Sequence, residues 1–252
     1  MSTDIVLETE ELNRSFGALR VTQDVSFRLP RGARYALIGP NGAGKSTFIN
    51  LLTGVLAPSS GRIRLEGADV TRTPAQERVR RGLARTFQIN TLFPSLTPLE
   101  ATTLAIAQRH GLCVNPFRRL SGCHAEIDEA TELLNRFDFG ADAERATHQL
   151  AYGRQRLLEI VLALAARPKV LLLDEPAAGV PQQESAEIFG ALSTLPKDVA
   201  VLFIEHDMDV VFRFAERITV LVAGQILCEG TPEEIADHSQ VREVYLGDGE
   251  DV

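Results

Sequence analysis

Nine consecutive residues near the start of the chain have the types and the spacing that hold phosphate groups. The glycines of this run let the backbone curl so that its N–H groups point inward, as a nest for anionic oxygens. Its lysine would reach the β- and γ-phosphates of a nucleotide, and its serine hydroxyl would ligate Mg²⁺. The run consists of Gly39, Pro40, Asn41, Gly42, Ala43, Gly44, Lys45, Ser46 and Thr47.

The segments on both sides of this loop favour a nucleotide site over an ordinary glycine-rich turn. Residues 35–38 read as a short buried strand, and residues 46–52 continue as a helix. The N-terminus of that helix adds a positive dipole end to the loop. A simple turn before a helix is the alternative interpretation, but the full spacing and both flanking segments fit a phosphate loop.

Two adjacent carboxylates lie further along the chain, at the end of an apolar run. Asp174 and Glu175 follow three leucines, which places them at the carboxyl end of a buried strand, where ligands bind in open α/β sheets. One acid can hold Mg²⁺, directly or through water, while the other faces the attacking water. A general base contributes about 10²–10⁴-fold to a rate, so its loss would nearly stop turnover and leave binding intact. A pair of acids that only caps a strand end is the alternative.

Two further polar side chains directly follow predicted strands. Gln88 ends one strand and His206 follows another. Taken alone, each is typical of a surface or capping residue. The strands of such a sheet deliver their carboxyl ends to one edge, so we expect both residues to converge with Lys45, Asp174 and Glu175 around one γ-phosphate.

The remaining pattern describes the elements that must position these side chains. Apolar runs at 170–173 and 200–204 are typical of parallel strands covered by helices on both sides. Between 97 and 166 the period becomes helical, and Pro168 ends the last helix of this stretch. The buried face of that helix is predicted to consist of Leu157, Ile160, Val161 and Leu164. These segments predict a nucleotide-binding α/β core interrupted by helices near residues 91–157.

The bulk composition of the 252 residues argues against a nucleic-acid partner, because the net charge is −8. We expect the arginine cluster that includes Arg78 and Arg80 to be a solvated helix face, with a docking patch for an acidic partner as the alternative. Cys113, Cys123 and Cys228 are widely spaced and read as reduced thiols. No stretch approaches the roughly 20 apolar residues that cross a bilayer, so we expect any work at a membrane to take place from its aqueous side.

The motifs occur in an order that resembles the ATP-hydrolysing subunit of an ATP-binding-cassette (ABC) transporter, over essentially the whole length. The motifs that carry this resemblance are the loop at 39–46, Gln88, the signature-like run Leu150–Gln155, Asp174-Glu175, the turn Ala178–Pro181 and His206. Within that family the chain is most similar to the branched-chain amino-acid uptake group. This likeness is carried by the stretches 83–88, 173–179, 204–208 and 244–247.

The resemblance implies a P-loop NTPase fold, in which helices flank a mixed, largely parallel sheet and N-terminal antiparallel strands and an inserted helical subdomain are added. The implied domain is 1–252, with its nucleotide-binding core at 1–90 and 158–230, the helical subdomain at 91–157 and a C-terminal helical tail at 231–252. The implied ligands are ATP and Mg²⁺. The implied partners are membrane-spanning permease subunits, a second ATPase subunit and an extracytoplasmic solute-binding protein, with the chain on the cytoplasmic face of the membrane.

The resemblance also assigns roles to individual residues. Phe16 would stack on adenine, Lys45 and Ser46 would hold phosphate and Mg²⁺, Gln88 would bridge Mg²⁺ and water, Asp174 would support the metal, Glu175 would polarise the water and His206 would touch the γ-phosphate. Each ATP would lie between one subunit's loop and the signature of the other. There the free N–H groups of a helix that starts at Ala151, Tyr152 and Gly153 would point at the γ-phosphate.

Three positions depart from the family pattern. Ala151 stands where a serine is usual, Arg154 stands where a glutamine is usual and could add a positive charge, and Pro181 replaces an acidic or amide residue. We still expect hydrolysis, because Glu175 and His206 are present. A soluble cassette ATPase that acts without transport, or an importer of urea, amides or aromatic acids, are the alternatives. A guanine-specific GTPase is disfavoured, since no Asn-Lys-x-Asp motif occurs.

Overall fold

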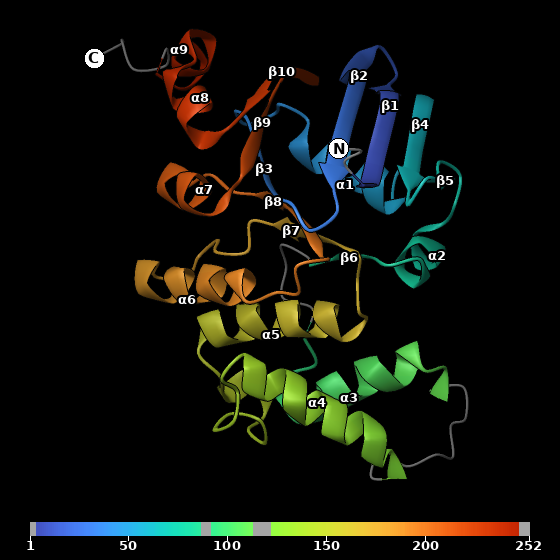
Figure 1. Ribbon diagram of the computed structural model, residues 1–252, viewed down its shortest axis with the longest axis vertical. Coiled ribbons are helices and arrows are strands. Elements are labelled where there is room, and N and C mark those ends of the chain that lie inside the picture. Colours follow the sequence, from blue (N-terminus) through green and yellow to red (C-terminus); the bar gives the residue numbers. More distant parts are fainter. Residues whose placement is uncertain (1–3, 87–91, 113–121, 247–252) are drawn as a thin grey trace. The chain divides into compact units, whose positions relative to one another are not determined.

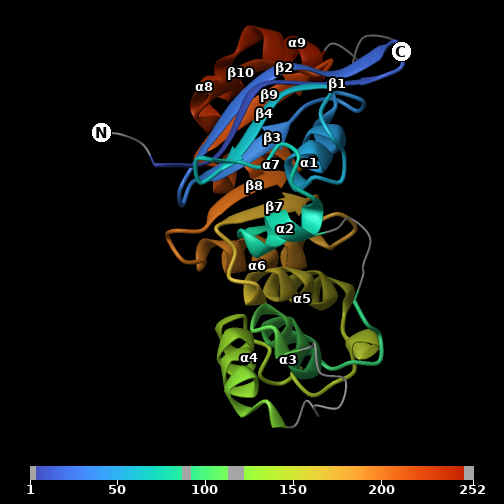
Figure 2. The same ribbon diagram turned by 90° about the vertical axis from the view of Figure 1, so that its right-hand side faces the viewer.

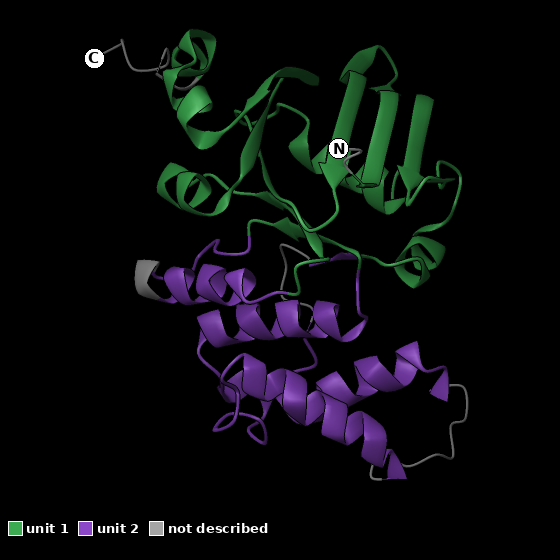
Figure 3. Ribbon diagram, in the orientation of Figure 1, with its two compact units in different colours: residues 1–83, 169–175, 196–252 green, residues 84–168, 176–195 purple. Residues whose placement is uncertain are grey.

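A computed structural model describes residues 4–86, 92–112 and 122–246 of the chain (Figure 1). The chain forms two compact units (Figure 3). The first unit comprises residues 1–83, 169–175 and 196–252, and the second comprises residues 84–168 and 176–195. The predicted division is a different one: it separates a nucleotide-binding core from a helical subdomain at residues 91–157. It stays a prediction.

The first unit begins with an antiparallel sheet in the order β2-β1-β4-β5. Its strands are β1 (Ile5–Phe16), β2 (Leu19–Pro30), β4 (Ser60–Leu65) and β5 (Ala68–Asp69). Figures 1 and 2 show β1, β2 and β4 side by side. A two-residue turn joins β1 to β2, and Gly17 has the positive φ (60°) that such a turn requires.

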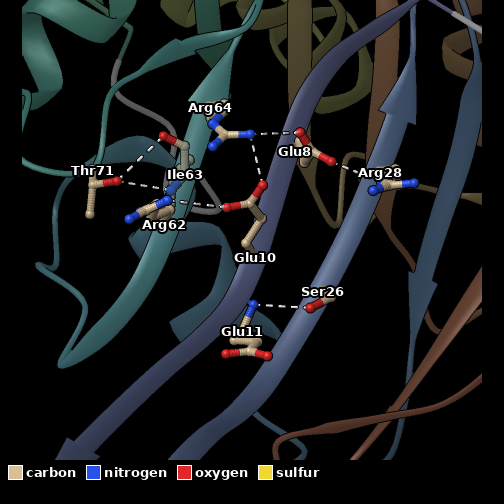
Figure 4. Close-up of polar contacts among 9 residues, drawn as sticks. All are labelled: Glu8, Glu10, Glu11, Ser26, Arg28, Arg62, Ile63, Arg64 and Thr71. Carbon is tan, nitrogen blue, oxygen red and sulfur yellow. Dashed lines mark hydrogen bonds and ion pairs between the residues drawn. The ribbon is translucent and has the colours of Figure 1, made fainter.

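The two faces of this antiparallel sheet differ in polarity, because alternate residues of a strand point to opposite faces. One face contributes residues such as Leu7, Phe27 and Ile63 to the core. The opposite face carries ion pairs that cross three strands (Figure 4). They are Arg28–Glu8 at 2.8 Å, Arg64–Glu8 at 3.7 Å, Arg64–Glu10 at 2.7 Å and Arg62–Glu10 at 4.0 Å. Ion pairs near the surface contribute little to stability, so the buried face accounts for most of the energy that holds this sheet in place.

The second sheet is mixed, with the order β10-β9-β3-β8-β7-β6. Its strands are β3 (Arg34–Ile38), β6 (Leu83–Arg85), β7 (Val170–Asp174), β8 (Ala200–Ile204), β9 (Arg217–Val222) and β10 (Gln225–Gly230). Neighbouring strands from β9 through β3 and β8 to β7 run parallel, and β10 runs antiparallel to β9. All five residues of β7 and of β8 are buried, as predicted from their unbroken apolar runs.

The core of the first unit lies around α1 (Lys45–Thr53). Buried side chains of this helix, among them Phe48 and Leu52, belong to one cluster with residues of both sheets, such as Leu172. Phe48 meets Phe27 edge to face, with ring centroids 5.8 Å apart. The other helices of this unit are α2 (Ala75–Arg80), α7 (Met208–Phe214), α8 (Pro232–Asp237) and α9 (Ser239–Leu246).

The second unit is helical. It contains α3 (Pro98–Arg109), α4 (His124–Arg136), α5 (Tyr152–Ala165), α6 (Gln182–Ser193) and a single 3-10 turn at Thr147–Gln149. Figures 1 and 2 show α3 and α4 side by side, and Ile106, Ala130 and Ala165 form a small core that joins α3, α4 and α5. The predicted buried face of α5 is confirmed, since Leu157, Ile160, Val161 and Leu164 are all buried. Within the described ranges, the helices are all too short or too polar to cross a bilayer.

Arg78 corrects one prediction, because it is buried and not part of a solvated helix face. Its side chain is 1% exposed and donates hydrogen bonds to four backbone carbonyl oxygens. Two of these carbonyls, those of Leu51 and Leu52, lie in the last turn of α1 at 2.7 Å. The guanidinium therefore satisfies carbonyls that a helix end leaves unpaired and lies at the negative end of its dipole. Burial lowers the pKa of Arg78 to about 10, which leaves the group charged at neutral pH.

We expect Arg78→Ala to lower the free energy of unfolding by about 3 kcal/mol or more, because the buried carbonyls lose a charged donor and a cavity forms. Urea denaturation of the purified chain measures this change. Arg80→Ala is the matched control, since that side chain is 79% exposed and should change the value by less than about 0.5 kcal/mol. Equal stability of the two variants would contradict a structural role for Arg78.

Candidate functional site

The register of three parallel strands brings the predicted chemical groups to one edge of the sheet. Ile204 at the end of β8 is paired with Leu37 of β3 and with Asp174 of β7. The phosphate loop begins two residues after Leu37, and His206 lies two residues after Ile204. Strands are about 4.8 Å apart, so these strand ends lie within about 10 Å of one another.

The loop that joins β3 to α1 is shaped by glycines at three points. Gly39 and Gly44 have positive φ values of 156° and 100° and press against the carbonyl oxygens of Leu221 and Val21, which leaves no room for a Cβ atom. Gly42 also has a positive φ, of 80°, but faces open space. The backbones of β2 and β9 therefore pack against one side of the loop. The opposite side, at Gly42, is open, and a ligand can reach it.

The remaining residues of the loop follow this division. Asn41 lies at its exposed tip, Ala43 is buried and Pro40 is half-buried. Ser46 is exposed at the start of α1 and Thr47 is half-buried beside it. Gly44 precedes the helix and offers no capping side chain, and the first turn of α1 contains no acidic residue. The N-terminus of α1 can therefore accept an anion without repulsion from its own side chains.

Lys45 is held inside the loop. Its amino group donates to the carbonyl oxygens of Gly39 at 2.6 Å and Pro40 at 3.1 Å, and the residue is 7% exposed. Burial lowers the pKa of the Lys45 amine, and the carboxylates of Glu175 and Asp174 act in the opposite direction. Both carboxylates thus lie close enough to influence the charge of Lys45, as the strand register requires.

Glu175 and His206 contact each other directly. The Oε1 atom of Glu175 lies 2.9 Å from the Nε2 atom of His206. Glu175 has a φ of +49°, a left-handed conformation that costs a residue other than glycine about 1–2 kcal/mol. The backbone N–H of Glu175 donates to the carbonyl of Ile204 at 3.0 Å, which fixes the turn. This local strain turns the chain out of β7 in a way that leaves the carboxylate beside His206.

The donor set fits a polyphosphate with a divalent ion. The helix N-terminus and the lysine match phosphate oxygens, and the oxygens of Ser46 and Asp174 are of the hard type that Mg²⁺ takes. Among the residues that the structure describes, no cluster of three or more His, Cys, Asp or Glu side chains could hold a metal ion.

The structure does not bring two predicted site residues into contact with this group, for different reasons. Gln88 lies outside the described residues, so its convergence with the others stays a prediction. Phe16 is the last residue of β1, where it is 44% exposed and pairs with Leu19 across the hairpin. Its ring is a large apolar surface open to solvent, and the guanidinium carbon of Arg14 lies 4.6 Å from the ring centroid.

The signature-like run forms the start of α5 in the second unit. Ala151 precedes the helix without a capping hydrogen bond, and Tyr152 is 42% exposed at its first position. The backbone N–H of Gly153 donates to the Oε2 atom of Glu184 at 3.1 Å. The expectation that this N–H is free is therefore wrong, because a carboxylate from the first turn of α6 accepts its hydrogen bond. A Cβ atom at position 153 would overlap that carboxylate.

Arg154 and Pro181 have structural partners in the same unit. The Arg154 guanidinium donates to Asp142 at 3.1 Å and to the carbonyl of Asp138 at 2.7 Å, and it lies 4.0 Å from the ring centroid of Phe139. Arg154 therefore attaches the start of α5 to the turn at 138–142. Pro181 is the residue before α6, a place where its fixed φ is tolerated.

Sequence reasoning missed Glu184 and Arg14. An acidic residue in the first turn of a helix is a common feature, so the position of Glu184 alone gave no reason to connect it with α5. Arg14 had a detectable signal, because residues two apart on a strand share a face and the other member of the pair is the exposed Phe16.

Comparison with known proteins agrees with the geometry of the site. The ABC transporter family matches residues 22–178, and the family described as branched-chain amino acid ATP-binding cassette transporter matches residues 225–251. The branched-chain amino acid transport ATP-binding protein BraF of Pseudomonas aeruginosa is 38% identical, over 96% of this chain and 98% of its own. LivG of Escherichia coli K12, which carries the same description, is 37% identical over 96% of this chain and 98% of its own.

A solved structure confirms the fold class predicted from the sequence. It is the ADP conformation of an ATP-binding cassette of an ABC transporter, with a TM-score of 0.83 and 30% identity over 96% of this chain and 99% of that one. Both the fold and the family match span the phosphate loop and the paired carboxylates. The chain belongs to the ABC transporter family, as one of its ATPase cassettes.

Proposed function

We propose that this cassette binds and hydrolyses ATP to drive an importer of branched-chain amino acids through membrane-spanning permease subunits. The observation that carries the proposal is the convergence of Lys45, Asp174 and the Glu175–His206 pair at one edge of the sheet. The solute rests on the relatives BraF and LivG and on the C-terminal match at residues 225–251. An importer of urea, amides or aromatic acids, or a cassette that acts without transport, are the alternatives.

The loop residues 39–47 would bind the phosphates of ATP. Phosphate oxygens would take the place of the Gly39 and Pro40 carbonyls as partners of the Lys45 amine. Ser46 and Asp174 would hold Mg²⁺, together with Gln88, and this ion would neutralise charge on the β- and γ-phosphates. Phe16 would stack on the adenine.

Glu175 is the group that would orient and deprotonate the attacking water. Its hydrogen bond to His206 fixes the carboxylate, and the imidazole would also reach the γ-phosphate. Phosphoryl transfer requires positioning and charge stabilisation more than covalent chemistry, so Lys45 and His206 would contribute by placing positive charge and hydrogen-bond donors around the phosphate.

A second cassette, either a copy of this chain or a similar one, would complete the site. Its α5 start, with the equivalents of Ala151, Tyr152 and Gly153, would approach the γ-phosphate from the other side. The Glu184 carboxylate would have to leave the N–H of Gly153 before a phosphate oxygen binds there. The helical segment 91–157 and Gln88 would pass this motion to the permease at the cytoplasmic face of the membrane, with an external solute-binding protein supplying the solute and no role for nucleic acid.

We expect Glu175→Gln to bind ATP normally and to release phosphate about 10²–10⁴-fold more slowly, because the amide cannot accept a proton from water. Phosphate-release kinetics and equilibrium ATP binding measure the two effects. Lys45→Ala is the contrasting variant, since it should lose ATP binding itself. Glutamine and glutamate tolerate the left-handed backbone at position 175 equally well, so the free energy of unfolding should not change. Phosphate release at the wild-type rate by Glu175→Gln would remove this residue from the proposed role.

We expect Glu184→Gln, placed in a Glu175→Gln background, to form the ATP-bound dimer at a roughly three- to tenfold lower ATP concentration. The neutral amide of glutamine accepts a weaker hydrogen bond than the carboxylate does, so a phosphate oxygen displaces it from the Gly153 N–H more easily. Analytical ultracentrifugation over an ATP series measures this midpoint. Glu187→Gln is the matched control, one turn along α6 and exposed, and should leave the midpoint unchanged. A higher midpoint for Glu184→Gln would show that the carboxylate supports the α5 start instead of competing with phosphate.

The solute is tested with the complete transporter reconstituted in vesicles. We expect leucine, isoleucine and valine, with the binding protein present, to stimulate ATP hydrolysis several-fold over the level without solute. Urea, short amides and aromatic acids should give no stimulation. Stimulation by one of these compounds and not by leucine would transfer the proposal to that alternative, while the ATPase assignment would stand.

A further inference from the structure

Arg14 covers one side of the exposed aromatic ring at the end of β1. Its guanidinium carbon lies 4.6 Å from the centroid of the Phe16 ring, within the range of a cation–π contact. Phe16 is nevertheless 44% exposed, so a substantial part of its surface stays accessible to a ligand. The pairing register of β1 shifts between Arg14 and Ser15, and the contact itself shows that both side chains lie on one side of the strand.

Hydrogen bonds to the segment after α1 hold Arg14 in place. One guanidinium nitrogen donates to the carbonyl oxygen of Ala57 at 2.8 Å. The residues on either side are attached to the same segment, since Ser59 N–H donates to the Asn13 carbonyl at 2.7 Å and Ser15 N–H donates to the Ser59 hydroxyl at 3.1 Å. The hydrogen bond to Ala57 and the attachment of the flanking residues therefore restrict the guanidinium, which lies over the ring.

The hairpin also places this ring at a definite distance from the phosphate loop. Phe16 pairs with Leu19, and two residues along β2 the carbonyl of Val21 abuts Gly44. From the rise along a strand and the spacing between strands, Phe16 lies roughly 10 Å from Gly44. Two hydrogen bonds fix this arrangement, from the Gln23 N–H to the Gly224 carbonyl and from the Gly224 N–H to the Ala43 carbonyl. A separation of this size matches that between the base and the outer phosphates of a nucleotide.

We propose that Arg14 is a positioning residue for the nucleobase, which holds the Phe16 ring so that its uncovered face receives the adenine. This inference rests on the proposed function of the site in ATP binding. The planar guanidinium covers the ring as a stacked layer, whereas the ammonium of a lysine would act only as a point charge. Without Arg14 the ring regains rotational freedom that nucleotide binding must then remove.

The test compares ATP with inorganic tripolyphosphate, which lacks a base, by calorimetric titration of the full chain. We expect Arg14→Ala to raise the Kd for ATP roughly three- to tenfold and to leave the Kd for tripolyphosphate unchanged. KM for ATP should rise by the same factor with kcat unchanged, and Arg14→Lys should restore part of the affinity. Arg20→Ala is the matched control, because that exposed arginine lies on the same hairpin and should change neither Kd.

A double-variant cycle with Phe16→Ala separates positioning from direct binding. If Arg14 acts through the ring, Arg14→Ala has no further effect on ATP affinity once Phe16 is alanine. Additive effects, unchanged ATP affinity in Arg14→Ala, or equal weakening of ATP and tripolyphosphate would each overturn the proposal. Failure of the wild-type chain to bind ATP would instead overturn the proposed function, so the two outcomes are distinguishable.

Discussion

The parallel register of β3, β8 and β7 is the constraint on which the rest of the site depends. Because Ile204 is paired with both Leu37 and Asp174, the loop that follows β3 and the carboxylates that follow β7 must meet at one edge. A slip of one residue between β8 and β7 would move Asp174 off Ile204 and out of line with the end of β3. The pairing of these buried strands therefore sets how close Lys45 lies to Asp174 and Glu175.

The groups assigned to phosphate already have partners within the chain. Lys45 donates to the loop carbonyls, Gly153 donates to Glu184, and Glu175 lies against His206. A polar group that is buried without a partner costs about 1–3 kcal/mol, so the folded chain avoids that cost by satisfying each group internally. A bound nucleotide would therefore mostly replace these internal hydrogen bonds with its own, and would add few new ones. Such an exchange would limit the affinity for nucleotide and would help the products of hydrolysis to leave.

Local patterns predicted much of this fold, and long-range contacts account for what they missed. The phosphate loop, the α5 face and the buried strands follow from spacing within a few residues. Arg78 was predicted to be solvated because its neighbours are charged, yet the carbonyls that bury it belong to α1, more than twenty residues away. Glu184 likewise acts on a helix 31 residues earlier in the chain. The hydrophobic period of a sequence cannot reveal a single side chain that bonds the end of a distant helix.

Under the proposed function, the distribution of chemistry between the two units would give cassettes a physical reason to work in pairs. The first unit contains the loop, the carboxylates and His206, whereas the start of α5 lies in the second unit. In this chain, the Gly153 N–H donates to its own Glu184. Under the proposed function, the γ-phosphate bound by a neighbouring cassette would have to displace that carboxylate from the N–H. Hydrolysis would then be tied to assembly, because the carboxylate could take back the N–H once the phosphate had left.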